Sequence, residues 1–158
     1  MAITPEILLA VQPLLGKATC RQRVGQGRTL SLGFGEKIFH GNPKLADPFY
    51  GEWEIGTYNA AWRFIRAGKI VIGSQDVFDS VADFNMALQK LPMGSVAKID
   101  QLTNTELRLS LSDGASVEFI CASSDKDEMF HIFAPEKQCI EYRCVGGWKI
   151  GPSNAPWT

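Results

Sequence analysis

Residues 106–121 read ELRLSLSDGASVEFIC, the most regular alternation of apolar and polar residues in the chain. Apolar residues occupy every second position on both sides of an Asp-Gly pair: Leu107, Leu109, Leu111, Val117, Phe119 and Cys121. A period of two is typical of a strand with one buried face. The Asp-Gly pair marks the reversal between two such strands. The stretch therefore predicts a β-hairpin at the centre of an antiparallel sheet.

The register of this hairpin follows from which residues face one another. A three-residue loop over residues 112–114 pairs Leu109 with Val117, so that all the apolar residues share one face. A two-residue loop would place them on opposite faces of the sheet. The three-residue loop also puts Gly114 at the position of positive φ, where glycine has the least strain. We therefore expect the three-residue loop.

A second hairpin is predicted over residues 61–73, AWRFIRAGKIVIG. With a three-residue loop at residues 66–68, Phe64 would face Ile70 and Trp62 would face Ile72, and glycine would again be the last loop residue.

Two short helices are predicted, at residues 5–12 and 81–91. Thr4 is a typical N-cap for the first, and Pro13 should end or kink it because proline lacks the amide hydrogen and clashes with the preceding turn. Ser80 is placed to cap the second helix, whose apolar residues recur at helical spacing. We expect both helices to pack on one face of the sheet.

Further strands are expected at residues 19–24, 29–34, 52–59, 95–102, 129–133 and 140–145. Residues 35–51 are rich in glycine and proline and lack regularly spaced apolar residues, so a long loop is predicted there. No repeat or linker divides the chain. The expected fold class is α+β, with mostly antiparallel sheet, in a single domain over residues 1–158.

The composition excludes several classes of function. The 158 residues have a formal net charge of −1 and no basic run, so charge gives no reason to expect binding to nucleic acid or to an anionic membrane. No apolar run approaches the ~20 residues that span a bilayer. The N-terminus lacks the charged and apolar regions of a signal peptide. We therefore expect a soluble, cytoplasmic protein.

The four cysteines of the chain are Cys20, Cys121, Cys139 and Cys144. They lack the short paired spacings of a zinc site, and the two histidines do not supply them. A cytoplasmic protein keeps its thiols reduced. We predict four free thiols, no metal and no cofactor.

No catalytic motif is present, and two Gly-x-Gly stretches lack the third glycine and the following helix of a nucleotide-binding loop. Ser74 and Asp76 follow a predicted strand, where a polar site and an ordinary turn before a helix are both open. His131 lies in a predicted strand and fits a hydrogen-bonded structural histidine. A nucleophile pair of Cys121 and His131 would require their strands to lie side by side.

Three groups of motifs occur together in residues 50–157, about two thirds of the chain: WEIGTY, AWR and GSQD (53–58, 61–63, 73–76); FICASSD and FHIF (119–125, 130–133); and GWKIG and SNAPW (147–151, 153–157). The set resembles a family of small bacterial proteins that look like the immunity partners of polymorphic or contact-dependent toxins. The resemblance implies a protein that binds and neutralises a toxin domain, and it brings no catalytic residue. Residues 1–50 lie outside it.

Many toxin domains of such systems cut nucleic acid, and their active sites tend to be basic because phosphates must be neutralised. An inhibitor with almost no net charge then needs a local acidic patch, and an aromatic anchor would slow dissociation. We expect the cognate toxin to bind the densest acidic cluster and the polar side of the strand from residue 52, at Glu52, Glu54, Tyr58, Asp125, Asp127 and Glu128.

The alternative is a small-molecule-binding protein or a hydrolase. Its site would be a sheet concavity near Trp62, Asp76 and His131. Because no catalytic motif is present, we favour the binding protein and predict no enzymatic activity.

Overall fold

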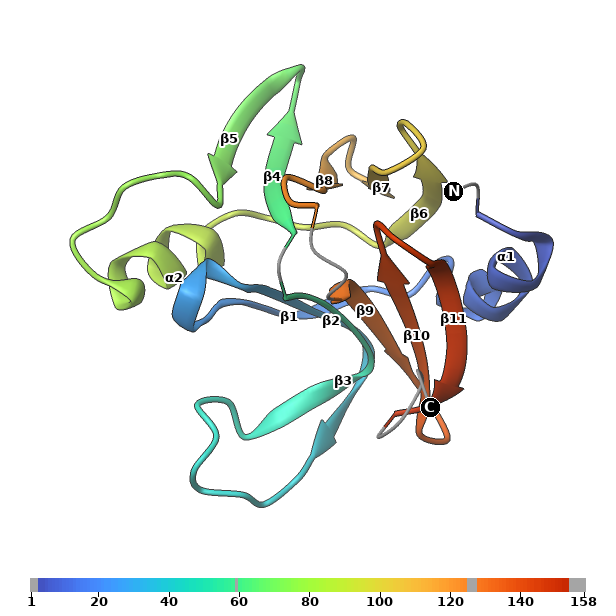
Figure 1. The fold of residues 1–158 in the computed structure, drawn as a ribbon. Helices are drawn as coiled ribbons and strands as arrows, with labels where there is room; N and C mark the ends of the chain where they lie inside the picture. Colours follow the sequence, from blue (N-terminus) through green and yellow to red (C-terminus); the bar gives the residue numbers. More distant parts are fainter. Residues whose placement is uncertain (1–2, 59, 125–127, 154–158) are drawn as a thin grey trace.

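The computed structural model describes residues 3–58, 60–124 and 128–153, which form two antiparallel sheets and two α-helices (Figure 1). The six-stranded sheet has the order β1 (Thr19–Val24), β2 (Leu30–Phe39), β3 (Phe49–Thr57), β9 (Glu128–Ala134), β10 (Gln138–Arg143) and β11 (Gly147–Pro152). The five-stranded sheet has the order β5 (Lys69–Gly73), β4 (Ala61–Arg66), β8 (Ser116–Ile120), β7 (Leu107–Leu111) and β6 (Val96–Gln101). The predicted α+β class with mostly antiparallel sheet is confirmed.

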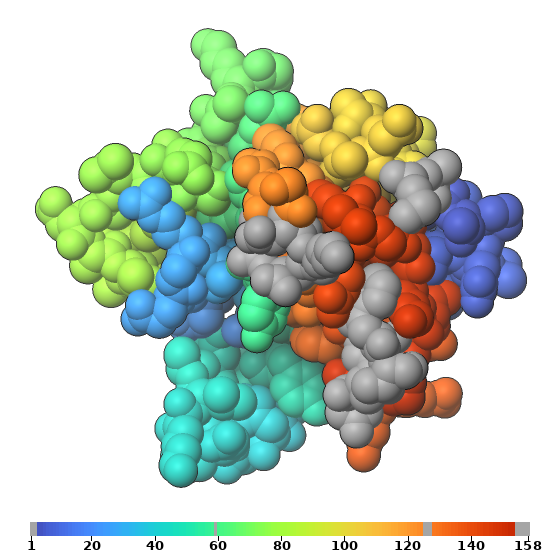
Figure 2. All heavy atoms as spheres, in the orientation of Figure 1, coloured from blue at the N-terminus to red at the C-terminus, as the bar shows by residue number. Residues whose placement is uncertain are grey.

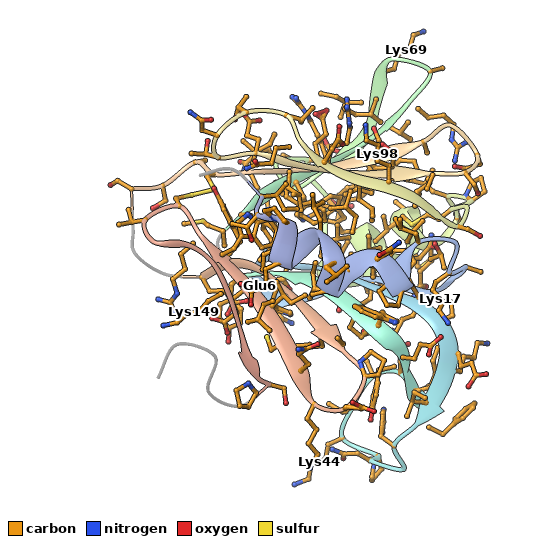
Figure 3. The ribbon with its side chains drawn as sticks, turned by 90° about the vertical axis from the view of Figure 1, so that its right-hand side faces the viewer. Glu6, Lys17, Lys44, Lys69, Lys98 and Lys149 are labelled. Atoms are coloured by element: carbon orange, nitrogen blue, oxygen red, sulfur yellow. A yellow bond between two sulfur atoms is a disulfide. The ribbon has the colours of Figure 1, made fainter. Side chains whose placement is uncertain are left out.

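The core lies between the two sheets, and the lysines labelled in Figure 3 lie on the outside. The largest fully buried side chains come from both sheets and both helical segments: Trp62, Phe34, Phe64, Phe119, Phe130, Leu14, Leu30, Leu32, Ile55, Leu88, Leu109 and Met129. The rings of Phe119 on β8 and Phe130 on β9 join the layers, with centroids 5.4 Å apart. Burying each such side chain contributes about 1.5–3 kcal/mol, so the inward faces hold the two sheets together.

The helices α1 (Pro5–Val11) and α2 (Val81–Gln89) lie at opposite ends of the molecule in Figure 1. The side chains of Thr4 and Ser80 cap them as predicted, by accepting hydrogen bonds from amides three residues later. A 3-10 turn at Gln12–Leu14 follows α1, so Pro13 ends the α-helix as expected. The expected packing of both helices on one face is not confirmed.

The central hairpin has the predicted register. Leu109 faces Val117 across β7 and β8, the amide of Leu111 donates to the carbonyl of Ala115, and Gly114 has a φ of 86°. The second hairpin differs from the prediction, because Phe64 faces Ile72 rather than Ile70.

The reason for that difference is a two-residue turn. Ala67 and Gly68 both have positive φ, a turn whose twist matches that of the strands, and a bulge opposite Phe64 takes up the extra residue. Trp62 and Ile72 still both face the core.

The long loop predicted at residues 35–51 is mostly strand, a second correction. After a bulge at Gly35, β2 continues to Phe39 and pairs with the start of β3, which leaves only residues 40–48 as loop. This part of the hairpin extends beyond the core (Figure 1), so its residues have no buried face to impose alternation. Strand β11 was also absent from the prediction. None of the described helices is long and apolar enough to cross a membrane.

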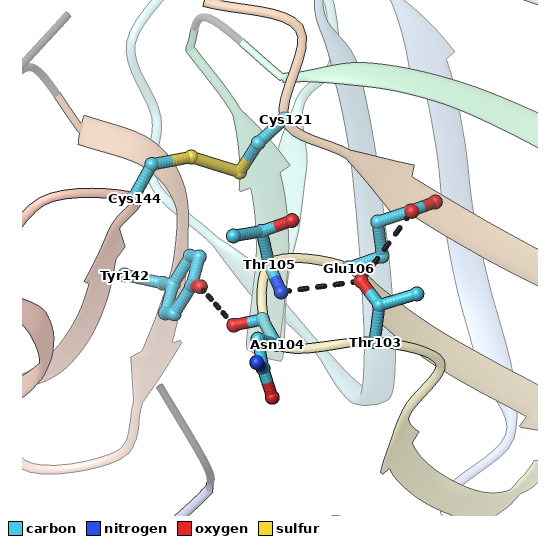
Figure 4. Close-up of a disulfide and its surroundings, with 7 residues drawn as sticks. All are labelled: Thr103, Asn104, Thr105, Glu106, Cys121, Tyr142 and Cys144. Carbon is cyan, nitrogen blue, oxygen red and sulfur yellow. Dashed lines mark hydrogen bonds between the residues drawn. A yellow bond between two sulfur atoms is a disulfide. The ribbon is translucent and has the colours of Figure 1, made fainter. Parts of the chain in front are cut away.

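The prediction of four free thiols is wrong. Cys121, which follows β8, forms a disulfide with Cys144, which follows β10, while Cys20 and Cys139 are free (Figure 4). The bond joins the ends of strands from the two sheets. The 23-residue separation has no short spacing that would identify the pair, because the proximity arises from the packing of the sheets.

Candidate functional site

The outer face of the six-stranded sheet is hollowed by a cavity of about 770 Å³. The tip of the β2–β3 hairpin stands on one side of it and the β9–β10 turn on the other (Figure 2). Its lining comes from these elements and from the end of β11: Ser31, Ile38, Tyr50, Gly51, Glu52, Glu54, His131, Phe133, Ala134, Pro135, Glu136, Lys137 and Ser153. The volume lies within the range of pockets that bind ligands.

Strand alternation points these side chains outward. On β3, Trp53 and Ile55 face the core, so Glu52 and Glu54 face the cavity. The register of β3 and β9 then places Glu54 opposite Phe133. Acidic and aromatic side chains therefore lie next to one another on the floor of the cavity.

Glycines on neighbouring strands let two of these side chains lie flat on the sheet. A Cβ on Gly33 would overlap the Glu54 carboxylate, and a Cβ on Gly56 would lie 2.5 Å from Nε2 of His131. Each glycine thus leaves the space that its neighbour's side chain occupies.

A charged network connects the cavity to the loop at residues 40–48. The Arg21 guanidinium donates to Glu54 Oε1 at 2.5 Å and to Asp47 Oδ2 at 2.8 Å. Arg23 donates to both oxygens of Asp47, at 2.7 and 2.9 Å. Asp47 therefore anchors this loop to the outer face of β1.

The two carboxylates of the network have pKa values that move in opposite directions. The hydrogen bonds from Arg23, helped by the charge of Arg21, lower the pKa of Asp47. Burial raises the pKa of Glu54, and the Arg21 charge opposes this effect without cancelling it. The ionised form of Glu54 is thus less well compensated than that of Asp47.

His131 is the centre of a second polar group. Its Nδ1 contacts the Glu128 carboxylate, and the ring of Tyr58 meets its ring edge-on, with centroids 6.3 Å apart. Glu141 faces His131 across β9 and β10. Burial, followed by the charge of Glu128, raises the pKa of Glu141.

Exposed aromatic side chains lie on the β2–β3 tip and beside His131. Tyr50 lines the cavity, whereas Phe39 and Phe49 point to the other face of the tip. The Phe39 and Tyr58 side chains are 70% and 68% exposed, and Tyr50, at 45%, stacks on His40 with ring centroids 6.0 Å apart. Lys37 Nζ lies 4.7 Å from the centre of the Phe49 ring. Large aromatic rings exposed to solvent are typical anchors of protein interfaces.

The outer face of the five-stranded sheet also carries charges that are paired from strand to strand. Arg63 contacts Glu118 at 3.3 Å, and Arg108 contacts Asp100 at 2.9 Å. Arg108 also faces Glu118 in the sheet register. Such alternating, mutually paired charges suit a solvated surface. We place the candidate site on the six-stranded sheet because its outer face holds the cavity of about 770 Å³.

The structure brings together four of the six residues predicted to bind a partner. Glu52 and Glu54 line the cavity, and Tyr58 and Glu128 lie beside His131 at its edge. Asp125 and Asp127 lie outside the described residues.

The alternative pocket at Trp62, Asp76 and His131 is not formed. Trp62 is a core residue whose indole Nε1 donates to the carbonyl of Arg28, and Asp76 accepts from the amide of Gly73 in an ordinary turn. His131 belongs to the other sheet. Cys121 is in a disulfide, so it has no thiol to form a nucleophile pair with His131.

No protein-family model, curated protein or solved structure matches this chain. Within the described residues, no group of three or more His, Cys, Asp or Glu side chains is arranged to hold a metal ion.

Several residues of the site had no clear signal in the sequence. Arg21 and Arg23 are two positions apart in a predicted strand, which places them on one face, but nothing indicated their partner Asp47 in the loop. Tyr50 fell in a segment predicted to be a loop. Phe133 was expected in a strand, but its position opposite Glu54 depends on the pairing of β3 with β9, which are far apart in the sequence.

Proposed function

We propose that this chain is a protein-binding inhibitor, an immunity protein that neutralises a bacterial toxin domain by direct binding. The observation that carries the proposal is the outer face of the six-stranded sheet, where the rings of Tyr50 and Phe133 line a cavity together with the side chains of Glu52, Glu54 and Glu136. Interfaces have aromatic anchors at their centre and polar groups around them. The proposal includes no catalytic activity, no cofactor and no nucleic-acid ligand.

The placement of the motifs supports this reading. The WEIGTY motif lies on β3 and the FHIF motif on β9, and the two strands are paired along the cavity floor, from Glu54 opposite Phe133 to Thr57 opposite Phe130. Motifs far apart in the sequence thus meet at one surface. If a toxin binds at this cavity, the β2–β3 tip and the β9–β10 turn would cover its active site.

The test is a neutralisation assay in bacteria. The genes that flank the gene for this chain are expressed singly, and any product that arrests growth is then co-expressed with the chain. We expect the wild type to restore growth, and a Tyr50→Ala, Tyr58→Ala double variant to fail. Leu9→Ala is the control, because Leu9 is also an exposed large side chain but lies on α1.

Two results would count against the proposal. If the wild type neutralises no toxic product of a flanking gene, the proposed function is wrong. If the double variant neutralises the toxin as well as the wild type does, the toxin does not bind at Tyr50 and Tyr58.

The second candidate function is binding of a small molecule in the same cavity. The observation in its favour is the volume of about 770 Å³, with mixed apolar and charged walls. This site differs from the pocket predicted from sequence, because His131 is the only residue that the two share.

A further inference from the structure

The charged side chains that line the cavity are mostly acidic. Glu52, Glu54 and Glu136 contribute three carboxylates and Lys137 one ammonium group. Glu52 is paired with Lys17 at 2.9 Å, whereas Glu54 shares its partner Arg21 with Asp47. Because water screens charges less in a partly desolvated cavity, the shared carboxylate of Glu54 still favours a further cationic hydrogen-bond donor.

Glu54 retains capacity for such a ligand. Its Oε1 accepts from Arg21 and its Oε2 accepts from the amide of Gly51 at 3.2 Å. Each carboxylate oxygen can accept two hydrogen bonds, so both atoms have a further lone pair. The pKa of Glu54 is raised by burial in spite of Arg21, which means that a further cation in the cavity would stabilise the ionised carboxylate.

The aromatic walls suit a planar cation. Phe133 faces Glu54 across the strands, and its ring lies beside that of His131, with centroids 4.3 Å apart. Tyr50 lines the opposite side, on the β2–β3 tip. A guanidinium group can donate two hydrogen bonds to a carboxylate in its plane while an aromatic ring packs on its face, which a lysine ammonium group cannot do.

We propose that the cavity receives an arginine side chain of the partner protein, with its guanidinium bound by Glu54 and packed against Phe133. This inference rests on the proposed function, since it names the group of the toxin that the site recognises. An inhibitor that takes an arginine from a basic active site removes a phosphate-binding charge as well as blocking access. The cavity is larger than one side chain, so residues on either side of the arginine would also be enclosed.

The first test uses the capped peptide acetyl-Gly-Arg-Gly-amide, with its citrulline analogue as a neutral control of the same shape. Binding to the full chain is followed by NMR through the signals of Gly51, Gly56 and the His131 ring. We expect the arginine peptide to shift these signals and to bind at least tenfold more tightly than the citrulline peptide. Equal affinities, or shifts confined to other surfaces, would overturn the inference.

Variants test which groups hold the peptide. Glu54→Gln and Glu136→Gln each remove a lining charge while keeping the side-chain shape, and the second lies in an exposed turn where misfolding is not expected. Each should weaken the arginine peptide severalfold and leave the citrulline peptide unchanged. Glu6→Gln on α1, on another part of the molecule (Figure 3), is the matched control.

The same variants separate this inference from the proposed function. If the toxin binds Glu54→Gln and Glu136→Gln as tightly as the wild type but loses affinity for the double tyrosine variant, the arginine site is wrong and the immunity function stands. If the arginine peptide binds but no toxin is neutralised, the proposed function fails and the cavity is a guanidinium site for another ligand.

Discussion

The imidazole of His131 lies across the backbone of Gly56 on the neighbouring strand, so that a Cβ on Gly56 would come within 2.5 Å of Nε2. The ring is held there from its other side by the contact between Nδ1 and Glu128. Because the ring cannot tilt away without losing that contact, Gly56 determines where the histidine lies on the cavity floor.

Gly56→Ala should therefore displace the His131 ring. We expect a loss of stability of roughly 1–3 kcal/mol, the usual effect of inserting an atom into filled space. Urea denaturation measures the loss, and the NMR signals of the ring report the displacement. Gly73→Ala on β5 is the control, since its nearest neighbour would be 3.3 Å away. An unchanged His131 spectrum in a folded Gly56→Ala protein would contradict the geometry.

The disulfide of Cys121 and Cys144 should stabilise the folded protein by lowering the conformational entropy of the unfolded chain. For a loop closed by residues 23 apart in sequence, the entropic effect is about 3 kcal/mol. We expect a reducing agent, or a Cys121→Ala, Cys144→Ala double variant, to lower the free energy of unfolding by an amount of that order.

Titration of thiols in denaturant without reductant should give two equivalents, from Cys20 and Cys139. Cys20→Ser is the control for the loss of a cysteine as such. Four equivalents in the oxidised, purified protein would show that the bond does not form. All four thiols would then be free, as the sequence analysis predicts for a cytoplasmic protein.

Alternation was sufficient to predict the register of the central hairpin, where one face of each strand is buried. The central hairpin was predicted to the residue because Leu109 and Val117 had to share the core face. At the β2–β3 tip the same reasoning predicted a loop, because Phe39 and Tyr50 extend beyond the core and nothing forces them to alternate. The part of the hairpin that carries the site was therefore the part with the weakest sequence signal.

The composition of the candidate site was predicted only in part. The outward side of β3 identified Glu52 and Glu54, since strand alternation follows from sequence alone. Their neighbours Arg21 and Phe133 depend on the pairing of β1 with β2 and of β3 with β9. Strand order within a sheet arises from the packing of the whole chain, and the disulfide between the two sheets has the same origin.

Asp47 should stabilise the folded protein at neutral pH and lose this effect in acid. Hydrogen bonds from Arg23 lower its pKa in the folded state, so its contribution is present above the ordinary pKa of 3.8 and disappears as the pH falls through the lowered value. We expect Asp47→Asn to cost about 1–3 kcal/mol at pH 7, because two half-buried guanidinium groups lose a charged acceptor.

At pH 2.5 the difference between Asp47→Asn and the wild type should be much smaller. Urea denaturation at the two pH values measures this, with Asp79→Asn, at an exposed position, as the control. A loss of stability that is the same at both pH values would mean that the charge of Asp47 is not the cause.

Glu141 should show the opposite pH dependence. Its side chain is 10% exposed, and its Oε2 lies 3.8 Å from Arg143 Nη2. No hydrogen-bond donor of the described residues reaches that oxygen. Burial and the charge of Glu128 raise the pKa in the folded state above its ordinary value of 4.5. The ionised form is therefore less stable in the folded protein than in the unfolded chain.

Since the folded pKa is the higher one, the wild type is most stable relative to a neutral variant below pH 4.5, and it loses stability as the pH rises through the folded pKa. Each unit by which the folded pKa exceeds the unfolded pKa corresponds to about 1.4 kcal/mol in the free energy of unfolding. Glu141→Gln should thus be more stable than the wild type at pH 7 and nearly equal to it at pH 4, whereas Glu6→Gln should show no such trend. Should Glu141→Gln prove less stable at pH 7, the ion pair with Arg143 outweighs the cost of burying the charge.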